Sequence, residues 1–270
     1  MKTRGTTPHD AAHPTGADVS RGPVIVLSCA YAGAGQVQSA LAAGSELACT
    51  SGTGIIPLCA AAADAWRRVE DMPGAAMSPL AIATIRGLVT AQITAILADS
   101  GQTRWCELAT AAPGAAEVFL QLFPHTRFIC VYRRCLEVAG AAVRANPWGL
   151  QGQGLAPYLL TYPGNSVAAL ASYWAYSAEQ LIEFEQAHRE VTHRVRYEDV
   201  TAYPDHTLAP VRVTLGLAGT AHPEPPRWLT EPGAPPTDPQ AEAPAEMIPE
   251  PLRERISHLH AELGYPPTQT

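Results

Sequence analysis

The chain has 270 residues, of which 47% are hydrophobic, and its formal net charge is −7. This length suits one large α/β domain or two small ones. The acidic balance argues against nucleic-acid binding, which needs a basic face. No apolar run approaches the roughly 18 residues of a membrane span, so we expect no membrane partner. Lys2 is the single lysine among 18 basic residues, so anion contacts must come from arginine or from backbone amides.

The two ends and the cysteines indicate how the chain is organised. Residues 1–22 are polar and lack the apolar core of a secretory signal, so we expect a disordered leader. Residues 23–270 are predicted to form a single domain. All six cysteines lie in the first half of the chain, without a Cys-x-x-Cys pair. They are expected to be reduced core residues of a cytoplasmic protein, and no cysteine or histidine spacing predicts a metal site.

The segment 23–41 predicts a strand, a tight loop and a helix. Val24 to Leu27 form a short apolar run typical of a buried strand, and small residues follow as far as Gly35. A segment with helical spacing then runs to Leu41. A turn of this kind directs backbone N–H groups and a helix N-terminus at an anion, although many such turns bind nothing.

The rest of the chain alternates predicted helices and strands. Ser78 and Pro79 predict the start of a long helix that Gly101 closes. Further strands are predicted at 104–109, 127–133 and 192–198, and further helices at 136–144, 166–188, 208–217 and 252–263, with one more through Val118 and Leu122. The stretch 44–63, the loop 146–162 and the proline-rich segment 218–251 receive no element. Alternation of this kind predicts a three-layer α/β/α fold around a parallel sheet.

Four stretches of the sequence carry a further signal. They are Ala30-Tyr-Ala-Gly-Ala-Gly35, Trp105-Cys-Glu107, Phe123-Pro-His-Thr-Arg-Phe-Ile-Cys-Val-Tyr-Arg133 and Val195-Arg-Tyr-Glu-Asp199. Together with the order of the elements, they resemble the sulfotransferase family, whose members move a sulfuryl group from PAPS to an alcohol, phenol or amine. The resemblance implies a P-loop-NTPase-like fold over roughly residues 23 to 265.

The resemblance also implies a cofactor site. The residues at the position of the family's 5′-phosphosulfate loop are Tyr31, Ala32, Gly33, Ala34, Gly35 and Gln36. Arg133 stands where the family's arginine grips the 3′-phosphate, although an ion pair with a nearby carboxylate is the alternative. Tyr197 resembles an adenine-side contact, and it is equally typical of strand packing.

The chain departs from the family's pattern at the residues that neutralise phosphate. The loop is usually P-[RK]-S-G-[TS]-[TS], but here Tyr31 replaces the basic residue, and Ala32, Ala34 and Gly35 replace the hydroxyl side chains. There are two further changes. Leu108 stands where the family has its strand lysine, and Ala141 stands where the family has a phosphate-binding serine. These changes should weaken catalysis before they abolish binding, because sulfuryl transfer builds negative charge on the leaving phosphate.

Two residues are candidates for the general base. Glu107 ends its predicted strand near the expected reacting centre, but a salt bridge to Arg133 or Arg134 would also explain it. His188, at the end of a helix, is the histidine candidate. The loop aromatics Trp148, Tyr158 and Tyr162 could line a pocket for an aromatic acceptor or anchor the loop itself.

Sulfuryl transfer from PAPS to a small acceptor, plausibly a bacterial secondary metabolite, is therefore the first hypothesis. A repurposed enzyme that no longer uses PAPS and a non-catalytic binding protein are the alternatives. A P-loop kinase is disfavoured because the motif G-x-x-x-x-G-K-[ST] is absent.

Overall fold

A computed structural model describes residues 21–43, 46–70, 77–110, 113–146, 149–150, 154–217 and 243–266. Five parallel strands form the central sheet in the order β2-β3-β1-β4-β5. The strands are β1 (Val24–Ser28), β2 (Leu47–Ser51), β3 (Arg104–Thr110), β4 (Arg127–Tyr132) and β5 (Thr192–Arg196). The predicted α/β fold with a parallel sheet is thus confirmed. The leader that was predicted at 1–22 lies outside the described residues, apart from its last two.

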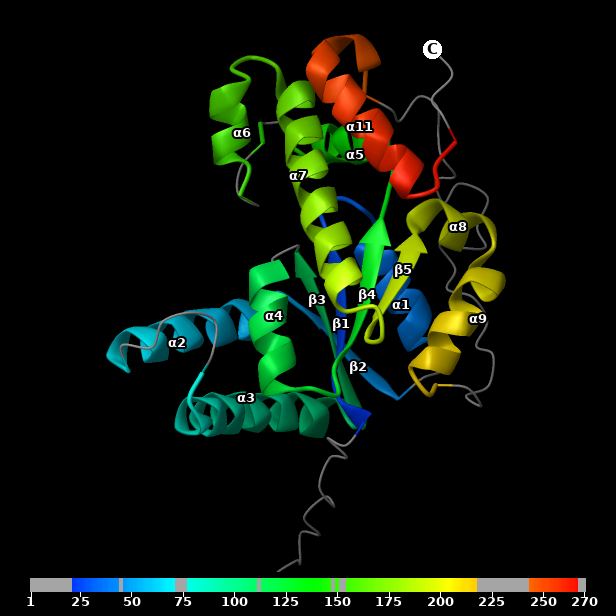
Figure 1. Ribbon diagram of the computed structural model, residues 1–270. Helices are drawn as coiled ribbons and strands as arrows, with labels where there is room; N and C mark the ends of the chain where they lie inside the picture. The colour runs from blue at the N-terminus through cyan, green and yellow to red at the C-terminus, as the bar shows by residue number, and fades with distance from the viewer. Residues whose placement is uncertain are drawn as a thin grey trace, which may run out of the picture.

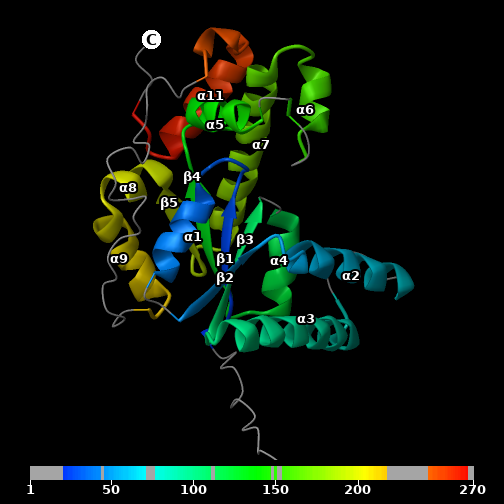
Figure 2. The same ribbon diagram turned by 180° about the vertical axis from the view of Figure 1, so that it is seen from behind.

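Helices cover both faces of this sheet (Figures 1 and 2). They are α1 (Ala34–Ala42), α2 (Ile55–Val69), α3 (Pro79–Ser100), α4 (Pro113–Leu122), α5 (Cys135–Ala145), α6 (Ala156–Thr161), α7 (Ser166–Ala187), α8 (Tyr197–Ala202), α9 (Pro204–Thr214) and α11 (Glu250–Glu262), with a 3₁₀ turn at Ala245–Met247. The core has two parts, one on each face of the sheet. Helices α2, α3, α4 and α7 pack on one face, and α1, α8 and α9 pack on the other. Helices α5, α6 and α11 lie beyond the carboxyl ends of the strands (Figure 1).

Local sequence explains the clearest elements. The run from Val24 to Ser28 is buried throughout, as expected of a central strand between two helix layers. At the start of α3, the Ser78 hydroxyl accepts a hydrogen bond from the Ala81 amide at 3.1 Å, and Gly101 ends the helix in the left-handed conformation. These are the two ends that the sequence predicts.

The structure differs from the predictions at several boundaries. Strand β2 and helices α2 and α6 occupy stretches to which the sequence pattern assigned nothing. The cap of α7 is Asn165 rather than Ser166, because its side chain accepts a hydrogen bond from the Ala168 amide at 3.0 Å. Strand β5 ends at Arg196, so Tyr197 opens a helix instead of lying in a strand. Of the proline-rich segment, 218–242 lie outside the described residues, and α11 begins at Glu250.

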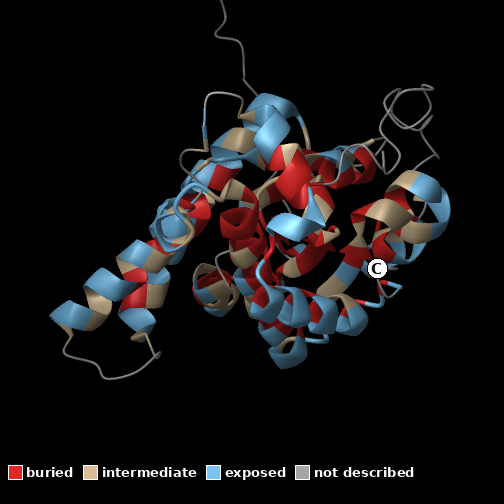
Figure 3. Cartoon of the chain, turned by 90° about the horizontal axis from the view of Figure 1, so that it is seen from above, coloured by how far each residue is buried: buried red, intermediate tan, exposed pale blue. Residues whose placement is uncertain are grey.

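Helices α2 and α3 form an arm that projects from the body of the molecule (Figure 3). Helix α3 is long and apolar enough to span a membrane by length and composition, contrary to the expectation from apolar runs. Its inward residues, among them Ile85, Val89 and Ile93, are buried against the rest of the chain, whereas Leu88 is 69% exposed. Since core helices of soluble proteins pass the same test, the composition of α3 alone does not indicate a membrane span.

Candidate functional site

The loop between β1 and α1 lies at the carboxyl edge of the sheet, where ligands bind in open α/β folds. Its backbone takes the left-handed conformation at Tyr31, with φ 66°, and at Gly33, with φ 80°. The loop residues 28–36 line an open pocket of about 290 Å³ together with Leu108 and Thr110 of β3. The six residues that resemble a phosphosulfate loop therefore line an open pocket.

Some backbone amides of this loop donate hydrogen bonds within the protein, and others have no acceptor in the described residues. The Ala30 amide donates to the Tyr173 hydroxyl at 3.0 Å, and the Gln36 amide donates to the Gly33 carbonyl at 3.1 Å. The amides of Ala34 and Gly35, in the first turn of α1, donate to no group within the described ranges. They carry the partial positive charge of a helix N-terminus, so the pocket can accept an anion.

None of the described residues that line this pocket has a charged side chain. Leu108 stands at the position of the family's lysine, and the longer polar side chains among the lining residues are those of Tyr31 and Gln36. The Tyr31 hydroxyl accepts a hydrogen bond from Asn146 Nδ2 at 2.9 Å. Arg21 cannot supply the charge, because it precedes β1 at the opposite edge of the sheet and pairs there with Glu46.

Arg133, Tyr197 and Gly33 form one cluster beside the pocket. The Arg133 guanidinium carbon lies 4.5 Å from the centre of the Tyr197 ring, a cation–π arrangement. The same ring is packed against Gly33, where an added Cβ would lie 2.3 Å from Tyr197 Cε2. The loop therefore needs glycine at position 33. Three residues that the sequence assigns to nucleotide binding are brought together here.

Arg133 also forms the ion pair that was the alternative prediction for it. Its Nε donates to Glu137 Oε2 at 3.1 Å, one helical turn along, and both side chains are largely buried, at 10% and 1% exposure. Burial, together with the nearby Glu198 carboxylate, raises the pKa of Glu137. Both Nη atoms of Arg133 lack a hydrogen-bond partner in the described part of the chain, so they can still bind a phosphate.

A second carboxylate, Glu198, connects three elements next to Arg133. It accepts hydrogen bonds from the Arg134 amide at 2.8 Å and from the Tyr265 hydroxyl at 3.1 Å. Nearby, His260 Nε2 accepts from the Cys135 amide at 3.3 Å. Burial and the neighbouring Arg134 charge lower the pKa of His260 to about 4, so this ring is neutral. His260 of the C-terminal helix α11 therefore contacts the start of α5. The sequence does not predict this contact.

Glu107 accepts hydrogen bonds from two threonines, which gives it a structural role. One of its oxygens accepts from the Thr50 hydroxyl, and the other accepts from the amide and hydroxyl of Thr53 at 3.0 and 2.9 Å. Neither Arg133 nor Arg134 is its partner, contrary to the predicted salt bridge; both arginines lie beside Glu137. Glu107 thus holds the turn between β2 and α2.

His188 lies far from the pocket. It ends α7 next to the amino ends of β4 and β5, and its Nε2 is 2.7 Å from Glu117 Oε1. The pocket lies at the opposite, carboxyl edge, so the structure does not bring His188 to it. Tyr158 packs edge-on against Tyr173 at 5.6 Å between ring centres, so it anchors α6 to α7. Trp148, the third loop aromatic, lies outside the described residues.

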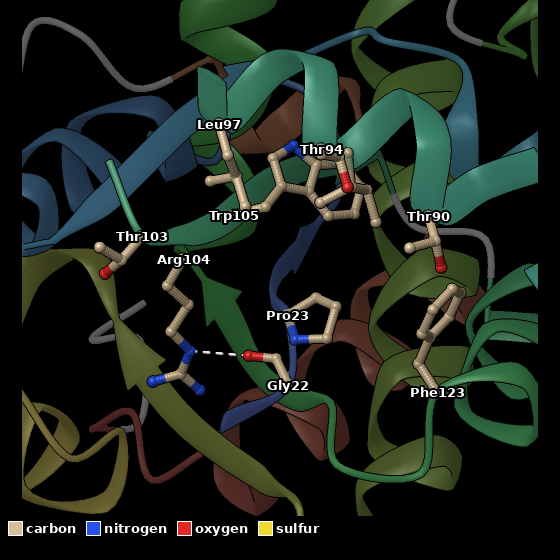
Figure 4. Close-up of a pocket in the computed structure, with 10 residues that line it drawn as sticks. Gly22, Pro23, Thr90, Thr94, Leu97, Thr103, Arg104, Trp105 and Phe123 are labelled. Atoms are coloured by element: carbon tan, nitrogen blue, oxygen red, sulfur yellow. Dashed lines mark hydrogen bonds between the residues drawn. The ribbon is translucent and has the colours of Figure 1, made fainter. Parts of the chain in front are cut away.

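A smaller cavity of about 20 Å³ lies at the amino ends of the strands (Figure 4). Its walls are Trp105, Phe123 and residues of α3, two of which are threonines, and Arg104 Nε donates across one side to the Gly22 carbonyl at 2.7 Å. The space suits one or two water molecules rather than a substrate. The loop pocket is therefore the better candidate for a functional site.

Comparison with known proteins concerns the family and the fold. The chain matches the model of the sulfotransferase family over residues 23–221. No curated protein sequence matches it. Its fold is similar to the sulfotransferase domain from the curacin biosynthetic pathway, with a TM-score of 0.56 and 15% identity over 91% of this chain and 98% of that one.

Two other solved structures have the same fold. The sulfotransferase domain of the Synechococcus PCC 7002 olefin synthase has a TM-score of 0.54 and 16% identity, over 90% of this chain and 94% of that one. A sulfotransferase from Alicyclobacillus acidocaldarius has a TM-score of 0.56 and 13% identity, over 90% and 96%. At such identities the likeness concerns the fold, whereas the family model covers most of the sequence. This chain therefore belongs to the sulfotransferase family.

Proposed function

We propose that the protein transfers a sulfuryl group from PAPS to a hydroxyl or amine of a small acceptor. One observation carries this proposal: two groups that can bind anions are both next to the Tyr197 ring. The amides of Ala34 and Gly35, which have no partner in the described residues, directly follow Gly33, which packs against this ring, and the Arg133 guanidinium carbon lies 4.5 Å from the ring centre. A nucleotide with one phosphate at each end of its ribose needs two such groups.

The residues present fit the phosphates of PAPS at these two points. Bound PAPS would supply a sulfuryl group on a phosphosulfate anhydride, with PAP as the leaving group. The amides of Ala34 and Gly35 would hold the 5′ side, and Arg133 would hold the 3′-phosphate. Glu137 fixes the orientation of Arg133 through Nε and leaves the two Nη atoms for the ligand. Tyr197 would keep both groups at a constant separation.

Because no charged side chain is found among the described residues that line the pocket, we expect slow transfer. Charge develops on the leaving phosphate, and one missing preorganised donor commonly reduces kcat by about 10²–10³. The helix N-terminus compensates for only about 0.3–1 kcal/mol of this loss. We therefore expect binding of the nucleotide to be retained better than turnover.

The proposals for the acceptor and for the cellular location rest on the similar structures, the cysteines and the pocket wall. Two of the similar structures are sulfotransferase domains from the curacin biosynthetic pathway and from an olefin synthase, which supports a role in bacterial secondary metabolism. A cytoplasmic location is in keeping with six free cysteines. The pocket wall formed by Leu108, Thr110 and Tyr31 would receive a small acceptor of mixed polarity.

Calorimetric titration with PAP tests the nucleotide site. Arg133→Ala alone would leave Glu137 buried and unpaired, so the sharper variant is Arg133→Gln/Glu137→Gln, which removes both charges at similar volume. We expect micromolar affinity that falls at least about tenfold in this variant. Arg255→Gln/Glu179→Gln removes an exposed ion pair elsewhere and should bind PAP normally.

Two results of this titration would contradict the proposal. If the folded wild-type protein does not bind PAP at millimolar concentration, the PAPS-dependent function is wrong. The same holds if both double variants bind as the wild type does, because the nucleotide would then not contact Arg133. The alternatives would be a repurposed enzyme or a non-catalytic protein of the same fold.

A further inference from the structure

Two cysteines of the sheet are direct neighbours on adjacent strands. Cys49 of β2 and Cys106 of β3 are register partners in a parallel pair, and both side chains lie on the face that α1 covers. Adjacent strands are about 4.8 Å apart, within the range of Cα separations that a disulfide can bridge. The two side chains also point the same way, because register partners share a face of the sheet.

Gln38 of α1 contacts both sulfur atoms. Its side-chain Nε2 lies 3.6 Å from Cys106 Sγ, and its backbone carbonyl lies 3.9 Å from Cys49 Sγ. The same Nε2 donates to the carbonyls of Thr50 at 2.9 Å and Cys106 at 3.2 Å. Gln38 therefore connects the two strands and contacts both thiols.

The two thiols also differ in the way that a redox pair requires. Cys49 is partly exposed, whereas the other five cysteines are buried. A hydrogen bond from the Cys106 thiol lowers the pKa of Cys49, while this bond and burial raise the pKa of Cys106. An accessible thiol of lowered pKa beside a buried thiol is the arrangement in which the first reacts with an oxidant and the second resolves the product.

We propose that Cys49 and Cys106 are a redox-active pair that forms a reversible disulfide between β2 and β3 when the protein meets a peroxide. The Cys49 thiolate would attack one oxygen of hydrogen peroxide, giving a sulfenic acid, with the other oxygen leaving as water after it takes up a proton. Cys106 would then displace the sulfenic oxygen, forming the S–S bond and releasing a second water. The two thiols are oxidised and one peroxide is reduced.

This bond would close the chain around the projecting arm. Helices α2 and α3 both lie between positions 49 and 106, so the disulfide would tie the two ends of this segment together. Closing a loop of this size restricts the unfolded chain and raises thermal stability. The proposed consequence is a protein whose β2–β3 region opens less readily in its oxidised form, independently of whether the nucleotide site is active.

The test is peroxide treatment of the full-length protein, followed by counting of free thiols and peptide mapping without reductant. We expect the thiols to fall from six to four, with a peptide that links Cys49 to Cys106 and reverts with dithiothreitol. Melting temperature should rise by about 5–10 °C on oxidation. Cys49→Ser and Cys106→Ser should each abolish the linked peptide, whereas Cys59→Ser, buried on α2, should retain it.

Several results would overturn the proposal. One such result is six titratable thiols after peroxide treatment, and another is conversion of Cys49 to the sulfinic acid while Cys106 stays free. A disulfide between two chains that Cys106→Ser still forms would equally contradict it. Should Cys106→Ser fail to fold, Cys49→Ser at the more exposed position decides the question alone, since it must lose the linked peptide while its circular dichroism stays native.

Discussion

Substitution of Gly33 by alanine tests the contact that joins the loop to Arg133. An alanine there must take φ 80°, which L residues adopt at a cost of about 1–2 kcal/mol. Its Cβ would also lie 2.3 Å from Tyr197 Cε2, so the ring must move by roughly 1 Å to regain ordinary contact. Overpacking of this kind costs about 1–3 kcal/mol, so we expect Gly33→Ala to lower the free energy of unfolding by about 2–5 kcal/mol.

Gly54→Ala provides a closely matched control. Gly54 is the residue before α2 just as Gly33 is before α1, and its φ of 76° is nearly the same. An added Cβ there meets nothing within 4 Å. Gly54→Ala should therefore show only the backbone cost, about 1–2 kcal/mol.

Urea unfolding of both variants measures the difference, and PAP titration of Gly33→Ala shows whether moving Tyr197 disturbs Arg133. A Tyr197→Ala background should remove most of the extra cost at position 33, because the clash is with that ring. Equal destabilisation by Gly33→Ala and Gly54→Ala would refute the reasoning, since it would mean that the Tyr197 ring does not pack against the loop.

Two further predictions concern Glu107 and His260. Glu107→Gln should destabilise the protein by about 1–3 kcal/mol, because an amide cannot accept from Thr50 and Thr53 as the carboxylate does; loss of turnover without loss of stability in urea would instead favour the general base. His260 is neutral when folded, because its pKa is lowered from 6.5 to about 4, so protonation favours unfolding. As the pH is lowered from about 6.5 to 4, the free energy of unfolding of the wild type should fall, and that of His260→Gln should fall less steeply. Identical urea profiles of the two proteins across that range would contradict this.

Much of the fold could be predicted where apolar spacing is unambiguous. The runs of β1 and β4 and the capped ends of α3 have strong local signals. Strand β2 and helix α2 were missed, because glycine and alanine dominate that stretch and packing on the sheet determines its structure instead. Helix α6 has only six residues and depends on contact with α7.

The candidate site could be predicted in part. Gly33, Arg133 and Tyr197 were placed by motif resemblance, and they do lie together. The partner Glu137 had a usable signal, since it follows Arg133 by four residues in a helix. The contacts of His260 and Tyr265 could not be found this way, because the sequence separates them widely from α5 and only the tertiary fold brings them near.

The most direct test of the proposed activity is a transfer assay with PAPS labelled in its sulfuryl group. The purified protein is incubated with a panel of small phenols, alcohols and amines, and both PAP release and label on the acceptor are followed. Sulfuryl transfer predicts that PAP and labelled acceptor appear in equal amounts, slowly, and fall together in Arg133→Gln/Glu137→Gln. PAP binding without any acceptor-dependent release of PAP across the panel would contradict it, and would indicate a binding protein on a sulfotransferase fold.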